Sequence, residues 1–137
     1  MFAHIIGSVL TPLHVDIEPR RGYLYVRFSG PYSTAAACTA YTQTLQGAAR
    51  HRETRILIDC TAVSGPMTTV DRRDFGQFMA EEQVRMSGQL AAPPQVGILV
   101  TSALMDPNRF TQVVANNRGV RMRSSESLQE LLSWLEV

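Results

Sequence analysis

The sequence contains no lysine, so all 13 of its basic residues are arginines. A chain without lysine amines cannot use one for Schiff-base catalysis, for the attachment of pyridoxal phosphate or in a Walker-type phosphate loop. Glycine-rich phosphate loops are missing as well. The net charge is only +1, which gives no indication of a nucleic-acid partner or of a strongly charged membrane-surface protein.

Cysteine and histidine are scarce. The two cysteines, Cys38 and Cys60, fall in a predicted helix and a predicted strand, so we expect two reduced thiols rather than a disulfide. No Cys/His spacing suits a metal site, and the sequence predicts neither a metal nor a cofactor. No run approaches the ~18 apolar residues of a membrane span, and residues 1–10 lack the basic start and full apolar core of a secretory signal. These absences predict a cytoplasmic protein without a transmembrane segment.

What is present is a chain of 137 residues, 45% hydrophobic and 18% charged, a balance typical of one globular domain. We expect residues 13–137 to form this domain and residues 1–12 to form an N-terminal arm or an extra edge strand. Periodicity predicts strands at 13–17 and 23–28, continuous buried strands at 56–58 and 96–100, and a short edge strand at 120–123. Helices are predicted from Pro31 to Arg50, Thr68 to Met86, Asp106 to Asn117, and Leu128 to Leu135 with Ser124 or Ser125 as the cap of the last.

This order of elements defines the expected fold class. The first two strands flank the turn Pro19–Gly22 and form an antiparallel hairpin. Each later strand follows a helix, and such crossovers imply parallel pairing. The sequence therefore predicts an α/β domain with a mixed five-stranded sheet and about four helices on its faces.

The junction after the third strand is the most informative segment. An apolar run ends on Asp59, and a polar turn with Gly65-Pro66 leads to two threonines that open the second helix. Ligands of α/β sheets bind outside the carboxyl ends of the strands, so this junction is the expected site. Gly76 within the helix and the Ser87-Gly88 exit weaken the helix locally, as a movable element would require.

The order of elements, the motif Ile56-Leu-Ile-Asp-Cys-Thr-Ala-Val-Ser-Gly-Pro66 and the ending from Val120 to Leu135 resemble the SpoIIAA-like branch of the STAS fold, which is also similar to the CRAL-TRIO lipid-transfer domain. The resemblance covers roughly residues 13–135. It implies a small bacterial cytosolic module that binds an apolar ligand, or a membrane surface through a movable helix.

In STAS antagonists of anti-sigma factors, an Asp-Ser-Ser-Gly turn after the third strand carries a phosphorylated serine. The matching place here reads Met67-Thr68-Thr69-Val70. A hydroxyl is kept at Thr68, but the preceding acid and the following glycine are missing. The resemblance therefore does not imply the phosphorylation switch for this chain.

Six polar residues are candidate contacts of a ligand or partner: Asp59, Ser64, Thr68, Thr69, Arg72 and Arg73. Asp59 could anchor a ligand or cap a loop, and the threonines could take a phosphate, bind an anion or cap the helix. The two arginines occupy the helix end that disfavours cations, which suits an acidic ligand or lipid headgroup, although neighbouring aspartates also suit a solvated face.

Four apolar residues are candidates for the lining of a pocket between this loop and the third helix: Phe75, Phe78, Met79 and Phe110. At helical spacing the three on the second helix fit a packed core equally.

No nucleophile, base and orienting group can be assembled from these residues. We expect a non-catalytic module that binds a lipid or another small apolar molecule, or that regulates at a membrane. A protein-interaction module of anti-sigma-antagonist type, using the loop Ser64–Thr69, is the alternative, and an enzyme of unknown class is the second. A homodimer is compatible with each.

Overall fold

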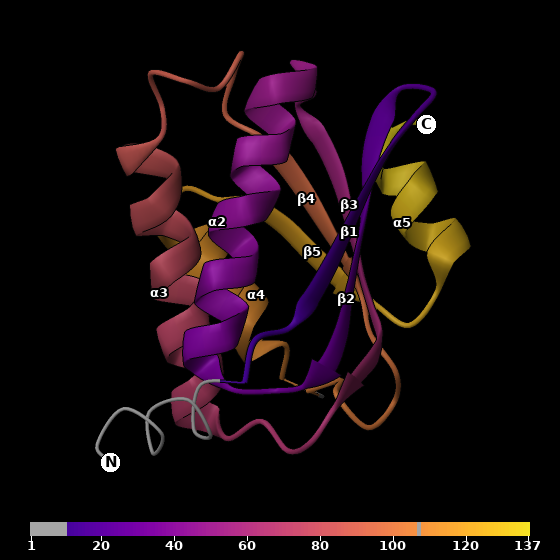
Figure 1. Ribbon diagram of the computed structural model, residues 1–137. Helices are drawn as coiled ribbons and strands as arrows, with labels where there is room; N and C mark the ends of the chain where they lie inside the picture. Colours follow the sequence, from indigo (N-terminus) through magenta and orange to yellow (C-terminus); the bar gives the residue numbers. More distant parts are fainter. Residues whose placement is uncertain (1–10, 107) are drawn as a thin grey trace.

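The computed structural model describes residues 11–106 and 108–137. Over these residues the chain forms five strands and four helices around one sheet with the order β1-β2-β3-β4-β5 (Figure 1). The strands are β1 (His14–Arg20), β2 (Tyr23–Pro31), β3 (Arg55–Ser64), β4 (Gln95–Leu99) and β5 (Arg121–Ser125). The helices are α2 (Thr34–His51), α3 (Thr69–Arg85), α4 (Phe110–Asn117) and α5 (Leu128–Leu135). The predicted N-terminal arm or strand lies outside the described residues except for Thr11 and Pro12, which are in neither a strand nor a helix.

The sheet is mixed, as the sequence predicts. β1 and β2 pair antiparallel, and the pairs β2–β3, β3–β4 and β4–β5 are parallel. In the middle of the sheet, Ile58 lies opposite Val26 on one side and Ile98 on the other. The predicted hairpin and the predicted central, parallel strands are therefore confirmed.

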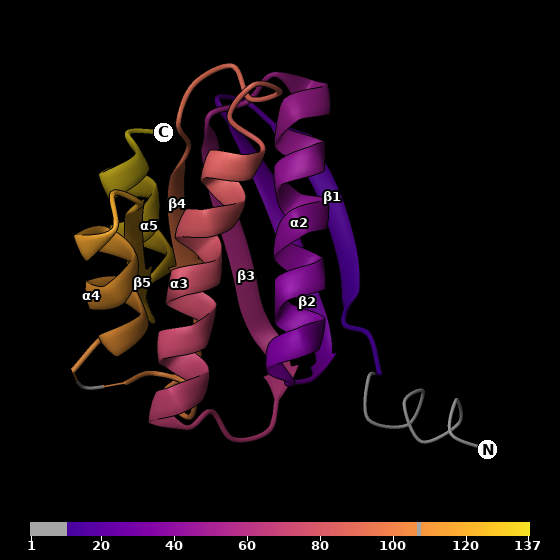
Figure 2. The same ribbon diagram turned by 90° about the vertical axis from the view of Figure 1, so that its left-hand side faces the viewer.

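Helices cover both faces of the sheet. Helices α2, α3 and α4 lie on one face and α5 lies on the other (Figures 1 and 2). On the first face Ile56 and Ile58 belong to the large core, whereas Leu57 packs with Leu131 and Leu135 in a smaller core under α5. This two-sided cover explains why the runs in β3 and β4 are continuously apolar instead of alternating.

Strand β3 is longer than its apolar run indicates. Asp59 lies within the strand and not at its end, because residues 62–64 continue to pair with residues 29–31 of β2. Strand β4 stops earlier, with Leu99 opposite Asp59. The second half of β3 thus has one strand neighbour instead of two.

Two helix starts also differ from prediction. Helix α2 begins at Thr34 and not at Pro31, because Pro31 still belongs to β2, and Ser33 accepts the Ala36 N–H as the cap. Helix α5 takes Ser127 as its cap, since the predicted caps fall in β5.

The third predicted helix begins late. Helix α4 starts at Phe110, although Asp106 still accepts the N–H of Phe110 at 2.9 Å and so caps the helix from a distance. Pro107, predicted in the first turn, lies outside the described residues.

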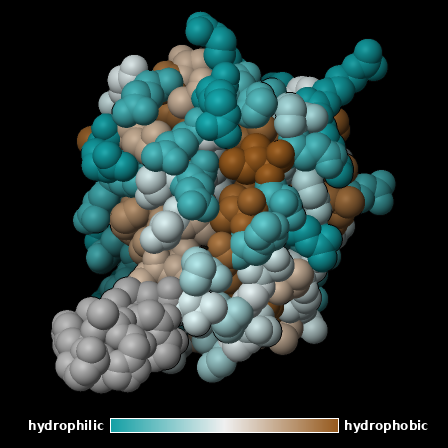
Figure 3. All heavy atoms as spheres, viewed as in Figure 1, coloured by the Kyte–Doolittle hydropathy of each residue, from teal (hydrophilic) through white to brown (hydrophobic). Residues whose placement is uncertain are grey.

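Most apolar side chains are inside the molecule. On the face seen in Figure 3, hydrophilic residues predominate and apolar atoms form a short strip near the middle. Val15 and Ile17 of the edge strand β1 pack against the large core and stay partly exposed. Within the described ranges, no helix has both the length and the apolar character needed to cross a membrane.

Candidate functional site

A tight turn connects the central strand to α3. Gly65 follows the last residue of β3. Its φ is 97°, a left-handed conformation that residues other than glycine rarely adopt. The carbonyl of Ser64 accepts the Tyr32 N–H at 2.7 Å, which fixes the turn beside the start of α2. The exposed Ser64 therefore contributes to the junction through its backbone.

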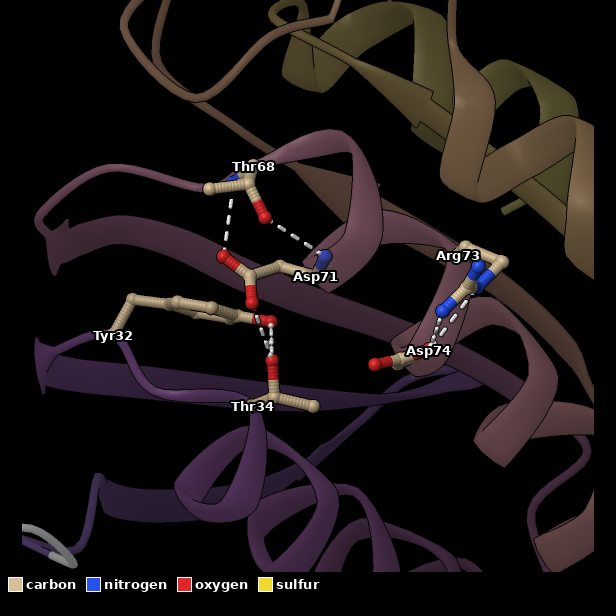
Figure 4. A network of polar contacts seen from close by, with 6 residues as sticks. All are labelled: Tyr32, Thr34, Thr68, Asp71, Arg73 and Asp74. Atoms are coloured by element: carbon tan, nitrogen blue, oxygen red, sulfur yellow. Dashed lines mark hydrogen bonds and ion pairs between the residues drawn. The ribbon is translucent and has the colours of Figure 1, made fainter.

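A capping box fixes the start of α3. The Thr68 hydroxyl accepts the Asp71 N–H at 3.0 Å, and the Asp71 carboxylate accepts the Thr68 N–H at 2.8 Å (Figure 4). The capping interpretation of Thr68 is confirmed. Thr69 is the first residue of the helix and is exposed.

The same carboxylate links α3 to α2. The other oxygen of Asp71 accepts the Thr34 hydroxyl at 3.0 Å, and Thr34 lies 3.0 Å from the Tyr32 hydroxyl (Figure 4). The Thr68 N–H is the main cause that lowers the pKa of Asp71, while burial raises the pKa of Tyr32 to about 12. An ionised carboxylate thus holds two helix starts together.

Arg72 and Arg73 do different things, although they are adjacent. The Arg72 guanidinium donates to the carbonyls of Met67 at 2.9 Å and Leu104 at 3.2 Å, so it connects the loop before α3 to the loop after β4. Arg73 is exposed and pairs with Asp74 at 3.1 Å (Figure 4). The solvated-face interpretation fits Arg73 but not Arg72.

Exposed residues gather at this end of α3. Pro66, Thr68, Thr69, Val70 and Arg73 are exposed, and we call them the α3 start surface. Val70 is apolar and 52% exposed, and it lies in the first turn of α3, which the hydrogen bonds of the capping box close. Single exposed apolar residues are common, but this one lies on a preorganised platform.

A pocket of about 80 Å³ lies between the sheet, α3 and the start of α4, and we call it the α3–α4 pocket. Most of its lining is apolar and comes from Leu13, Phe28, Ile58, Val63, Phe75, Ile98, Val100, Leu104, Phe110 and Met122. Its polar lining includes Arg72, Asp106, Arg109 and Ser124. The pocket includes Ile98 near the carboxyl end of β4 and Val100 and Leu104 just after it, and ligands of α/β sheets bind at this end of the strands.

Two of the four predicted pocket residues line the pocket. Phe75 and Phe110 do, and Phe75 also contacts the Tyr41 ring edge to face with centroids 5.9 Å apart. Met79 is fully buried in the large core, and Phe78 packs against that core. The core interpretation therefore describes Met79 and Phe78.

Asp59 lies away from the other candidates. It accepts the hydroxyls of Tyr25 at 2.5 Å and Thr61 at 2.6 Å. Its neighbour Leu57, two residues before it on the strand, packs under α5, so Asp59 points to the face opposite α3. Burial opposes ionisation of Asp59, but the bonds from Thr61 and Tyr25 outweigh burial and leave its pKa below the ordinary value. It has no place in the α3–α4 pocket or the α3 start surface.

Gly76 lies in the contact between α3 and α4. It is buried, and a Cβ built on it would lie 3.0 Å from the Thr111 carbonyl and 3.1 Å from Val114. Glycine at this position lets α3 and α4 approach closely. Gly76 therefore has a packing role, and the local weakness expected of α3 stays a prediction.

Sequence reasoning missed the contribution of the loop after β4 and of β5. Leu104, Asp106, Arg109 and Ser124 all line the pocket, and none was a candidate. The carboxyl ends of neighbouring parallel strands meet at one edge of a sheet. The position of these residues after β4 and within β5 could therefore have indicated that they line the site.

The described side chains of the site offer binding groups, and the thiol among them is not activated. Burial raises the pKa of the Cys60 thiol, which lines the pocket, to about 12 and keeps it protonated at neutral pH. Cys60 and Cys38 are both free, as expected. In the described part of the chain, no cluster of three or more His, Cys, Asp or Glu could hold a metal ion.

Comparisons with known proteins identify the fold of this chain. The sequence matches no protein-family model and no curated protein. The structure is similar to that of an anti-sigma factor antagonist from Mycobacterium paratuberculosis, with a TM-score of 0.54 and 14% identity over 91% of this chain and 95% of that one. It is also similar to an uncharacterised DUF3478-family protein with a SpoIIAA-like fold from Shewanella loihica PV-4, with a TM-score of 0.52 and 18% identity over 90% and 94% of the two chains. The chain has the SpoIIAA-like fold of STAS domains, which confirms the resemblance at the level of the fold.

Proposed function

We propose that this chain is a non-catalytic regulatory module that binds a protein partner through the α3 start surface. The half-exposed Val70 on its capped helix start carries the proposal, because an apolar side chain on a rigid base can bind with little ordering cost. The similarity to an anti-sigma factor antagonist supports a partner of anti-sigma-factor type. Two free thiols fit the cytoplasmic location included in this proposal.

The contact differs from a phosphorylation switch. The Thr68 hydroxyl is engaged as a helix cap, and the turn lacks the acid and glycine of the antagonist motif. The proposed surface therefore relies on shape and apolar contact. Arg73 stands beside Val70 with its charge already paired by Asp74, so it adds a polar rim.

A matched pair of variants on α3 tests this function. Val70→Arg places a charge on the α3 start surface, and Val84→Arg places one at the other end of the same helix, where Val84 is 76% exposed. The purified protein is titrated against each anti-sigma-type regulator encoded in its source genome. We expect Val70→Arg to weaken binding by about tenfold or more and Val84→Arg to leave it unchanged. Equal binding by both variants, or no binding by the wild type, would contradict the proposal.

The α3–α4 pocket suggests a second function, the binding of a small ligand. Its lining is mostly apolar, and it includes Met67 and Arg72 at the start of α3. Pockets for drug-sized ligands occupy about 300–1,000 Å³. At about 80 Å³, the pocket is too small for a long lipid chain, so this function requires a smaller molecule than the lipid expected from the sequence.

A further inference from the structure

We propose that the α3–α4 pocket binds a short-chain aliphatic monocarboxylate, with the hydrocarbon inside and the carboxylate at Arg109. This rests on the ligand-binding function of the pocket and is independent of the α3 start surface. The size of the pocket, the charge of its lining and a serine hydroxyl in its wall support this assignment.

The size of the pocket limits the hydrocarbon. An apolar cavity of about 150 Å³ holds benzene. The α3–α4 pocket has about half that volume, 80 Å³. It therefore suits a hydrocarbon of about three to five carbons, scaled from that benzene cavity. The surrounding side chains, including Ile58, Val63 and Ile98, offer it apolar contact on several sides.

The charged lining favours an anion. Arg72 and Arg109 both line the pocket, and Asp106 is the one carboxylate among its lining residues. Asp106 is already occupied, because it accepts the N–H groups of Phe110 at 2.9 Å and Asn108 at 3.2 Å. The Arg72 guanidinium donates to two backbone carbonyls. Among the described residues, Arg109 makes no side-chain hydrogen bond or ion pair. Its charge helps to lower the pKa of Glu130, but that carboxylate pairs with Arg123 at 2.9 Å and accepts the Ser125 hydroxyl, so the Arg109 guanidinium can still bind a ligand.

A serine hydroxyl in the wall of the pocket adds a hydrogen-bond donor. Ser124 is 9% exposed and lines the pocket. Its backbone N–H donates to Gln112, but its side chain forms no hydrogen bond within the described part of the chain. Since Ser124 and Arg109 line the same pocket, the hydroxyl can donate a second hydrogen bond to a carboxylate held by the guanidinium.

Pentanoate and its uncharged analogue pentanamide test the proposal. Each is titrated into methyl-labelled protein, and the methyl signals of Ile58, Val63 and Ile98 are followed by NMR, with the exposed Val84 as the reference. We expect saturable shifts with pentanoate at the three lining residues. Pentanamide should bind at least about tenfold more weakly than pentanoate, because a charge-assisted hydrogen bond to Arg109 is lost.

Two arginine variants test the role of Arg109, one as the test and one as the control. Arg109→Gln should weaken pentanoate binding about tenfold or more, whereas Arg121→Gln should not, since Arg121 is exposed and does not line the pocket. Equal weakening by both variants, or equal affinity for pentanamide, would overturn the anion site while leaving the pocket as an apolar one. Absence of binding by both compounds would overturn the ligand function itself. The proposed binding of a protein partner is tested separately, by the titration of the Val70→Arg variant.

Discussion

At the scale of single residues, Asp71 links the starts of α2 and α3. One carboxylate oxygen closes the capping box with Thr68, and the other accepts the hydroxyl of Thr34 on α2. The pKa of Asp71 lies below its ordinary value of 3.8, mainly because of the Thr68 N–H, with burial opposing the shift and Thr34 adding to it. The folded state therefore favours the ionised form.

The pH dependence of this contribution has a definite sign. A carboxyl whose pKa is lower in the folded state adds stability above its unfolded pKa, about 3.9, and loses it as the pH falls through the folded value. Asp71→Asn should reduce the free energy of unfolding by about 1 kcal/mol at pH 7. The difference from wild type should shrink below about pH 4. Urea unfolding at several pH values measures both.

Asp74→Asn is the control for this variant. Asp74 pairs with Arg73 at the surface, so its loss should change stability by less than about 0.5 kcal/mol. A cost of Asp71→Asn that is the same at pH 7 and well below pH 4 would contradict a role for the ionised carboxylate.

At the scale of elements, the contact between α3 and α4 shapes the pocket. Gly76 brings the two helices together, and Phe75 and Phe110, one from each helix, line the pocket nearby. Helix propensity alone predicts that Gly76→Ala stabilises α3 by about 1 kcal/mol. The packing predicts the opposite, because the new methyl group would press on Thr111 and Val114.

We therefore expect Gly76→Ala to lower the free energy of unfolding by about 1–3 kcal/mol, as overpacking does. Gly88→Ala is the matched control, since a Cβ there meets no atom within 4 Å, and its effect should be close to neutral. Chemical unfolding of both variants gives the answer. A stabilised Gly76→Ala protein would show that α4 moves aside at no cost.

At the scale of the whole molecule, the sheet separates two cores that share its central strands. Ile58 is fully buried on the side of α2 to α4, and Leu57 is fully buried on the side of α5. Because consecutive residues of one strand serve both cores, the two layers are expected to unfold together.

Truncation of Ile58 tests its place in this core. Ile58→Ala should cost about 2–5 kcal/mol, because a buried methyl cluster is lost and a cavity remains. Val84→Ala, on an exposed side chain, should cost less than about 0.5 kcal/mol. Denaturant unfolding followed by circular dichroism measures both. A cost for Ile58→Ala as small as that for Val84→Ala would mean that β3 is not central.

The fold was largely predictable because local patterns encode it. The continuous runs at Ile58 and Ile98 predict strands covered on both faces, and the alternation of strands and helices predicts the parallel crossovers. Helix caps were less certain where several hydroxyls compete, as at Ser127, because pairing of β5 decides which serine is free. The length of β3 also depended on a partner strand far away in the sequence.

The sequence by itself determined the fold class, the strand–loop–helix junction and a helix start at Thr68 or Thr69, since each depends on residues close together in the chain. The structure identified Thr68 as the cap. Only the tertiary structure decided which side chains share the site. It placed Asp59 on the opposite face, gave Arg72 two carbonyls from separate loops, and brought Arg109 to the pocket. The physical reason is that strand direction and helix packing fix where a side chain points, and both are set by contacts between distant segments.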